Sequence, residues 1–166
     1  MYALIGLGNP GKIYQNTRHN LGTNLISKLL GELSLPKSNK PVKYRDWIIA
    51  IPTIYMNQSG LAVQKILSYY KIVPENLYVA HDDLDLKVGD YKIQFDRGPA
   101  GHNGIKSIIE NLGTQAFNRI RIGIDHPSAN IAVEDYVLKP FLSAEKSIIN
   151  QTIDKILPEI KNLFEN

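Results

Sequence analysis

The chain has 166 residues, a length that suits one domain with a sizeable core, and 43% of them are hydrophobic, which excludes intrinsic disorder. It contains no cysteine, so disulfides, thiolate nucleophiles and zinc–thiolate sites are excluded. Its net charge of +3 is a mild basic excess, which is compatible with a nucleic-acid partner but does not establish one. The apolar runs are too short to cross a bilayer and no signal-peptide pattern opens the chain, so we expect a cytoplasmic protein with no membrane contact.

Strand and helix patterns alternate along the chain. The expected strands are YALIGL (2–7), WIIAIP (47–52), NLYVAHDDLDL (76–86), DYKIQF (90–95) and RIRIGID (119–125). The expected helices cover residues 21–33, 58–72, 105–113 and about 143–165, with Pro158 kinking or restarting the last one. In RIRIGID, arginines alternate with isoleucines, which predicts one basic and one apolar face. The pattern predicts a single α/β domain over residues 1–166 with a mainly parallel sheet flanked by helices.

The stretch GLGNPGKIYQNTRHNLG (6–22) contains a literal G-x-G-x-x-G, the dinucleotide-binding fingerprint. That motif requires a helix to begin at the glycines, so that its N-terminus faces a pyrophosphate. Here Pro10-Gly11 is a turn signal, and helical periodicity begins only at Leu21. The sequence therefore favours a site built around His19 over a dinucleotide site.

Four polar segments follow expected strands, and ligands of open α/β sheets bind beyond the carboxyl ends of the strands. These segments supply His19 and His102, the carboxylate of Asp82, and the amides of Asn9, Asn57 and Asn103. A histidine can deprotonate water while a carboxylate on its other nitrogen fixes the tautomer, and amides can donate to a developing oxyanion. The set predicts attack of water on a carbonyl, without a covalent intermediate.

Other interpretations of these residues stay open at this point. His81 and the aspartates of HDDLD could hold Mg²⁺ or Zn²⁺, although no second ligand group has metal-site spacing. Two histidines acting as acid and base would suit a ribonuclease, but this leaves the three asparagines unexplained. The basic residues around the glycine-rich loop fit a phosphate surface or a solvated face equally well; they include Lys92, Arg97, Lys106 and Arg121.

Five motifs in this order resemble bacterial peptidyl-tRNA hydrolases, over the region from Met1 to about Phe141. The motifs are GLGNPGKIYQNTRHNLG, PTIYMNQSG, VAHDDLDL, GHNGIKSI and RIRIGIDHP. The resemblance implies a monomeric α/β protein with a mixed central sheet that needs no metal or other cofactor. It also implies an enzyme that cleaves the ester between a peptide, or another N-blocked aminoacyl group, and the 3′ end of tRNA, which recycles tRNA from peptidyl-tRNA released too early by ribosomes.

The resemblance also implies roles for individual residues. His19 matches the family's catalytic base and Asp82 the residue that holds it, while Asn9 matches the position that distinguishes blocked from unblocked aminoacyl-tRNA. Asn57 is the expected oxyanion donor. The positions that match contacts to the acceptor end or line the same crevice are Tyr14, Tyr55, Met56, Asn57, His102 and Asn103.

The chain departs from many relatives in ways that concern the RNA contacts. It is shorter between Lys37 and Trp47 and after Phe141, which implies a reduced lid and terminal helix. Gln94 stands where relatives often carry a lysine, and the loop 128–135 lacks a basic residue, although Arg97 could compensate for the first change. Chloroplast intron-splicing factors share this fold and act as RNA-binding proteins, so a non-catalytic RNA-binding function is the alternative.

Overall fold

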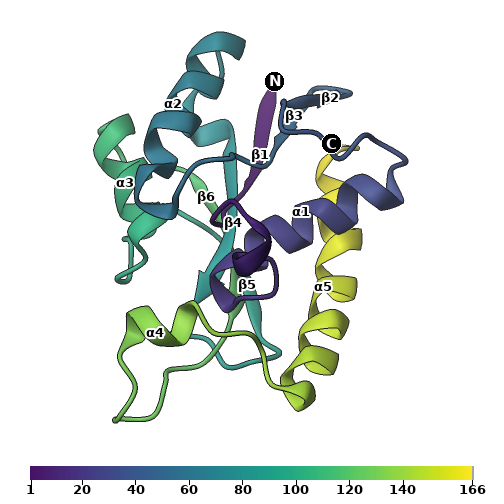
Figure 1. Cartoon of the computed structure of the whole chain (residues 1–166). Helices are drawn as coiled ribbons and strands as arrows, with labels where there is room; N and C mark the ends of the chain where they lie inside the picture. The colour runs from purple at the N-terminus through teal and green to yellow at the C-terminus, as the bar shows by residue number, and fades with distance from the viewer. Residues whose placement is uncertain (166) are drawn as a thin grey trace.

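A central sheet separates two layers of helices, with α1 and α5 on one face and α2 and α3 on the other (Figure 1). The computed structural model describes residues 1–165. Within them, the strands are β1 (Tyr2–Gly6), β2 (Val42–Tyr44), β3 (Trp47–Ala50), β4 (Leu77–Asp83), β5 (Tyr91–Phe95) and β6 (Asn118–Gly123). The α-helices are α1 (Leu21–Glu32), α2 (Ser59–Tyr70), α3 (Asn103–Leu112), α4 (Val133–Val137) and α5 (Ser143–Leu163).

The strand order in the described part of the chain is β2-β3-β1-β4-β6-β5. The four inner strands β3, β1, β4 and β6 are parallel, and the edge strands β2 and β5 are antiparallel to their neighbours. The mixed, mainly parallel sheet predicted from the sequence is therefore confirmed. Because the inner strands are parallel, the carboxyl ends of β1, β3, β4 and β6 meet at one edge of the sheet.

The inner strands are buried on both faces, which explains why they read as continuous apolar runs in the sequence. Along β1, Leu4 packs into the cluster under α1 and α5, while Ala3 and Ile5 pack into the cluster under α2 and α3. All three side chains are fully buried.

Close packing of α1 against the sheet sets the position of the residues before it. A Cβ atom on Gly22 would lie 2.1 Å from the carbonyl oxygen of Ala80, and one on Gly6 would lie 2.4 Å from that of Gly22. Only glycine permits this approach. The first turn of α1 therefore lies directly against β1 and β4, which brings His19 to the end of β4.

Several details differ from the expectations. The short elements β2 and α4 were not expected, and α5 continues through Pro158 without interruption. Pro158 is exposed, while Ile153, Ile156 and Ile160 on the inner side hold the helix to the core. A proline removes a single backbone hydrogen bond of the helix, and this packing is sufficient to keep the helix continuous there.

The two faces of β6 differ as expected, with its isoleucines in the core under α1 and α5, but its arginines do not form an exposed basic surface. Arg119 and Arg121 are 1% and 4% exposed. Arg119 donates to the carbonyl groups of Phe117 and Arg97, and Arg121 donates to the Asp83 carboxylate at 2.8 Å and to the Gln94 side chain at 2.9 Å. Both arginines therefore have protein partners and are covered by neighbouring chain segments.

Candidate active site

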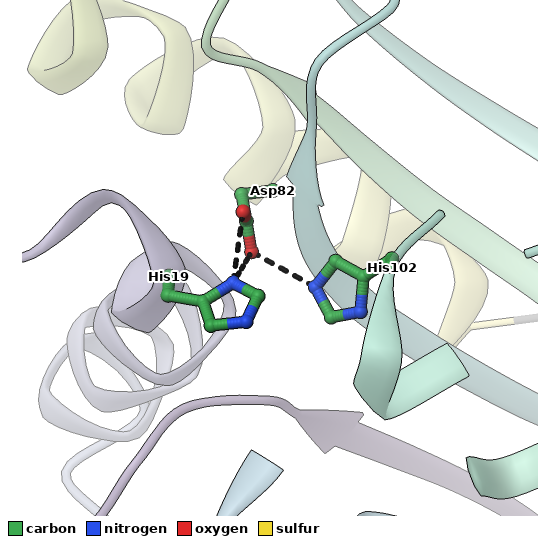
Figure 2. Close-up of side chains that lie close together, drawn as sticks. All are labelled: His19, Asp82 and His102. Carbon is green, nitrogen blue, oxygen red and sulfur yellow. Dashed lines mark hydrogen bonds and ion pairs between the residues drawn. The ribbon is translucent and has the colours of Figure 1, made fainter. Parts of the chain in front are cut away.

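Three side chains from distant parts of the sequence meet at the carboxyl end of β4 (Figure 2). His19 lies in the short 3-10 helix Arg18–Asn20 that leads into α1, Asp82 is the second-last residue of β4, and His102 is the N-cap of α3. All three are buried, at 7%, 2% and 9% exposure. The structure thus brings together the histidines and the carboxylate that the sequence analysis selected.

The hydrogen bond between His19 and Asp82 defines the tautomer of the histidine. Nδ1 of His19 lies 3.0 Å from each carboxylate oxygen of Asp82. An ionised carboxylate can only accept, so Nδ1 carries the proton and donates it. Nε2 is then unprotonated in the neutral ring, and it has no hydrogen-bond partner among residues 1–165. This nitrogen is placed to accept a proton.

His102 has a different and fixed role. The backbone N–H groups of Gly104 and Ile105 both donate to Nδ1 of His102, at 3.2 Å each, which caps α3. Nδ1 must therefore be unprotonated, and Nε2 carries the proton that it donates to Oδ1 of Asp82 at 3.0 Å. Both ring nitrogens of His102 are occupied, so this residue holds Asp82 and is not available as a second acid or base. The ribonuclease interpretation is therefore not supported, because it requires a second histidine that can act as acid or base.

The charges of this group are set by the same contacts. Burial lowers the pKa of His19, but the charge and the hydrogen bond of Asp82 outweigh burial, so that the pKa is raised above its ordinary value. Burial raises the pKa of Asp82, but the two histidines that donate to it hold this pKa well below its usual range. Asp82 is therefore ionised at neutral pH, and it stabilises the imidazolium form of His19.

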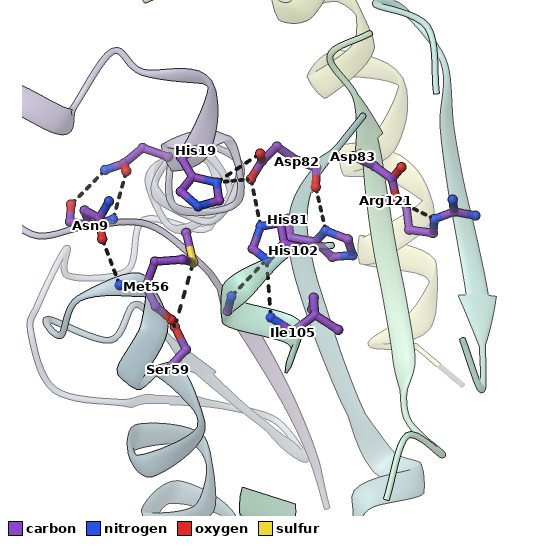
Figure 3. A network of polar contacts seen from close by, with 12 residues as sticks. Asn9, His19, Met56, Ser59, His81, Asp82, Asp83, His102, Ile105 and Arg121 are labelled. Carbon is purple, nitrogen blue, oxygen red and sulfur yellow. Dashed lines mark hydrogen bonds and ion pairs between the residues drawn. The ribbon is translucent and has the colours of Figure 1, made fainter. Parts of the chain in front are cut away.

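Asn9 is oriented by two neighbours (Figure 3). Its backbone N–H donates to Oδ1 of Asn20 at 2.8 Å, and Nδ2 of Asn20 donates to its carbonyl oxygen at 2.9 Å. The Oδ1 atom of Asn9 accepts the backbone N–H of Met56 at 2.8 Å. Because the oxygen is occupied, the Nδ2 group of Asn9 remains as a donor at the site.

Two hollows adjoin His19. The smaller has a volume of about 90 Å³ and the larger is an open cleft of about 510 Å³. The smaller is lined by His19, Asp82, Asp83, Leu84, residues 99–103, Val133, Glu134 and Val137. The larger is lined by Asn9, His19, residues 55–58, Asn103, Glu134, Val137 and Leu138. His19 therefore faces a space large enough for part of a substrate.

The larger cleft contains four of the six residues expected to contact the acceptor end or line the crevice. Tyr55 is 56% exposed at its rim, and Met56 is buried in its wall. The side-chain amides of Asn57 and Asn103 line the cleft and have no hydrogen-bond partner among residues 1–165. Unpaired amides beside a histidine with a vacant nitrogen are suited to binding a polar substrate.

Other predicted residues lie away from this cleft. Tyr14 is in the 3-10 helix Lys12–Tyr14 and lines neither hollow. Lys92, Arg97 and Lys106 are exposed, and Lys106 makes one loose ion pair with Glu110 at 4.0 Å. Arg121 is the correction: its burial and its bonds to Asp83 and Gln94 leave its guanidinium no open surface for a phosphate.

The residues of HDDLD do not converge as metal ligands. Asp82 faces the histidines and Asp83 faces Arg121, while Nδ1 of His81 donates to the backbone carbonyl of Asp82. Burial lowers the pKa of His81 well below its ordinary value, so this ring is neutral. Among residues 1–165, the ligand atoms that lie within 4.8 Å of one another belong to His19, Asp82 and His102. Their nitrogens are directed at the carboxylate as hydrogen-bond donors.

Sequence reasoning missed two supporting residues and one wall of the site. Asn20 orients Asn9, and Arg18 contacts the segment that carries α4. Their only sequence signal was their place beside His19 in TRHN. The helix α4 supplies Glu134 and Val137 to both hollows, and its five residues are too few to show helical periodicity.

The chain matches known proteins along its whole length. Residues 3–166 match the family described as peptidyl-tRNA hydrolase, so the similarity continues beyond Phe141. The peptidyl-tRNA hydrolase of Rickettsia canadensis is 43% identical over 176 aligned positions, covering 100% of this chain and 95% of that protein, and that of Brevibacillus brevis is 40% identical over 162, covering 92% and 86%. The crystal structure of peptidyl-tRNA hydrolase from Acinetobacter baumannii superposes with a TM-score of 0.92 at 32% identity, covering 99% of this chain and 89% of that one. The fold, the matched length and these identities show that the chain belongs to the peptidyl-tRNA hydrolase family.

Proposed function

We propose that this protein hydrolyses the ester bond between a peptide, or an N-blocked aminoacyl group, and the 3′ end of tRNA. The observation that carries the proposal is the state of His19: its Nδ1 is held by Asp82, and its Nε2 is vacant beside an open cleft lined by unpaired amides. Membership of the family supports the choice of substrate.

In the first step, Nε2 of His19 takes a proton from a water molecule as the water oxygen attacks the ester carbonyl. Asp82 stabilises the imidazolium that forms, because its carboxylate is already bonded to Nδ1–H. In the second step, the imidazolium returns the proton to the ribose oxygen as the ester bond breaks. The products are a free peptide carboxylate and a tRNA with a free terminal hydroxyl. No covalent intermediate and no metal take part.

The amides of the cleft have two roles in this proposal: Asn57 stabilises the oxyanion, and Asn9 binds the acyl group. Asn57 donates to the oxyanion that develops on the attacked carbonyl, a role that an amide fills without titrating. Asn9 presents only its Nδ2 donor, because Met56 N–H occupies its oxygen. This donor fits the carbonyl of the amide that blocks the amino group, and a free α-ammonium offers no acceptor at that point.

The remaining expected residues are assigned to the RNA. The residues at the larger cleft, Tyr55, Met56, Asn57 and Asn103, contact the acceptor end together with Tyr14, and His102 lies beside them in the smaller hollow. The phosphate contacts fall to the exposed side chains of Lys92, Arg97 and Lys106.

In this proposal the enzyme is a monomer that acts in the cytoplasm, where peptidyl-tRNA arises. No helix of the described residues combines the length and the apolar character that crossing a bilayer requires.

An isotope experiment tests the reaction. Incubation with N-acetyl-aminoacyl-tRNA in H₂¹⁸O should release deacylated tRNA and should place one ¹⁸O atom in the carboxylate of the N-acetyl amino acid. Binding of the substrate without release would instead support the RNA-binding alternative, and label in the tRNA hydroxyl would exclude attack of water on the carbonyl.

A further inference from the structure

One buried arginine beside His19 makes contacts with a single distant segment of the chain. Arg18 is 4% exposed, and its guanidinium donates to the carbonyl oxygens of Lys139 at 3.3 Å and Pro140 at 3.0 Å. Its Nη2 atom donates to Oε2 of Glu145 at 2.7 Å. The backbone N–H of Arg18 also donates to the carbonyl of Lys139 at 3.1 Å.

Aromatic rings complete the environment of this guanidinium. Its carbon lies 4.1 Å from the ring centre of Tyr136 and 5.2 Å from that of Phe141. Glu145, besides pairing with Arg18, accepts the backbone N–H of Leu142 at 2.7 Å and so caps the start of α5. One side chain thereby ties residues 136–145 to the turn that carries His19.

The segment that Arg18 holds is a wall of the cleft. The helix α4 leads directly into residues 139–140, and its Glu134 and Val137 line both hollows. In Figure 1, α4 lies apart from both helical layers, below the sheet, between the connection from β6 and the short connection to α5. The ion pair and the rings at the guanidinium hold this wall beside His19. The hydroxyl of Tyr136, which donates to the carbonyl of Ile124, and the buried side chains of Val137 and Phe141 also hold it.

The chemistry of this wall suits the peptide part of the substrate and not the phosphates. Its first turn carries Glu134 and Asp135, and Val137 and Leu138 follow. Carboxylates repel a phosphodiester chain, whereas the apolar side chains can pack against an uncharged acyl group.

We infer that Arg18 is a positioning residue that holds α4 against the catalytic turn and so fixes the width of the cleft for the acyl and peptide part of the substrate. This inference rests on the proposed function. Arg18 does not touch the reacting atoms in this arrangement, because both Nη atoms are used by Lys139, Pro140 and Glu145. It acts by keeping the binding wall in place.

The test uses Arg18→Lys, which keeps the charge but cannot reproduce the forked bonds and the stacking of a guanidinium. We expect KM for a tripeptidyl-tRNA to rise about tenfold, which corresponds to about 1.4 kcal/mol of lost binding, with kcat changed less than about twofold. The Kd for deacylated tRNA should stay the same, because the wall faces the peptide. Glu145→Gln keeps an acceptor for Leu142 N–H and should give a smaller rise in KM of about threefold.

Asp154→Asn is the matched control. It removes an ion pair between α5 and α1, Asp154 with Lys28, which lies on the exposed surface and makes no contact with α4. Its KM should equal that of the wild type. Partial unfolding of a variant would lower the apparent kcat and leave KM unchanged, so the rise in KM separates positioning from stability.

Amide hydrogen exchange of residues 133–138 gives a readout that does not depend on activity, and it should be faster in Arg18→Lys than in the wild type or Asp154→Asn. Unchanged exchange together with an unchanged KM would overturn the inference. A rise in the Kd for deacylated tRNA equal to the rise in KM would also overturn it, since the wall would then face the RNA. A wild-type protein that releases no tRNA would refute the proposed function, and the exchange result would still decide whether Arg18 holds α4.

Discussion

Nδ1 of His19 lies 3.0 Å from both carboxylate oxygens of Asp82, and the two side chains are 9% and 2% exposed. In this geometry the carboxylate raises the pKa of the histidine against the opposing effect of burial. The base must be unprotonated to act, so the rate falls at low pH as His19 takes up a proton. The acidic limb of the pH–rate profile therefore reports the strength of this contact.

Asp82→Asn should move the acidic limb to lower pH, because the charge that raises the pKa of His19 is lost. The rate should fall by roughly 10- to 10⁴-fold, the upper value being that of a tautomer error in a serine-protease triad. The profile of kcat against pH checks both effects. Full activity with an unshifted acidic limb would mean that Asp82 has only a structural role at the end of β4.

His102→Asn should shift the same limb in the opposite direction. Asparagine is a good N-cap and keeps the start of α3, but it is too short to replace the bond from His102 to Asp82. With one donor fewer, the carboxylate stabilises the imidazolium of His19 more strongly, so the acidic limb should move to higher pH. Loss of a hydrogen bond to a charged group should lower the free energy of unfolding by about 1.5–3 kcal/mol, measurable by urea titration. A limb that moves to lower pH would contradict the assignment of His102 as a hydrogen-bond donor that competes with His19 for Asp82.

Asn9→Asp should reduce selectivity for blocked substrates. The carboxylate can still accept Met56 N–H, but the Nδ2 donor that faces the substrate is replaced by a charged acceptor. Hydrolysis of N-acetyl-aminoacyl-tRNA should therefore fall more than hydrolysis of unblocked aminoacyl-tRNA. Equal selectivity ratios for the variant and the wild type would remove Asn9 from substrate choice.

Binding of tRNA should weaken steeply with salt, and the exposed basic residues should carry this dependence. Replacing Lys92, Arg97 or Lys106 by Gln should each lower the slope of log K against log salt concentration by about 0.7 to 0.9 if the side chain contacts a phosphate. Lys155→Gln on α5, on the other face of the sheet from α3, is the control and should leave the slope unchanged. An affinity that does not respond to salt would exclude a phosphate surface.

The sequence predicted the alternating strands and helices because the inner strands are buried on both faces and the helices carry apolar stripes. It also selected His19, Asp82 and Asn9, since polar residues at the carboxyl ends of parallel strands converge. His102 reaches the site although it does not follow the carboxyl end of a parallel strand. The strand before it, β5, is antiparallel to β6, so its carboxyl end lies at the opposite edge of the sheet, and the chain must run back to reach Asp82.

Other features could not be predicted because they depend on tertiary contacts. The arginines of β6 read as a basic face, but a partner such as Asp83, which comes from β4, was visible only in the fold. The reason for two glycines of the opening motif is also tertiary, because Gly6 and Gly22 allow α1 to pack against the sheet. Arg18 contacts the segment that follows α4 through the carbonyl of Lys139, which is 121 residues away in the sequence.

The release of tRNA from N-acetyl-aminoacyl-tRNA, compared between the wild type and His19→Ala, tests most directly whether His19 is the base. The wild type should release tRNA, and the variant should be slower by about 10²- to 10⁴-fold, the usual loss when a general base is removed. The Kd for deacylated tRNA should be nearly the same in both, because Nε2 of His19 has no partner among residues 1–165. The variant should still fold, but at a lower urea midpoint, because the bond from His19 to the charged Asp82 is lost. A folded His19→Ala variant that releases tRNA at close to the wild-type rate would contradict the assignment of His19 as the base.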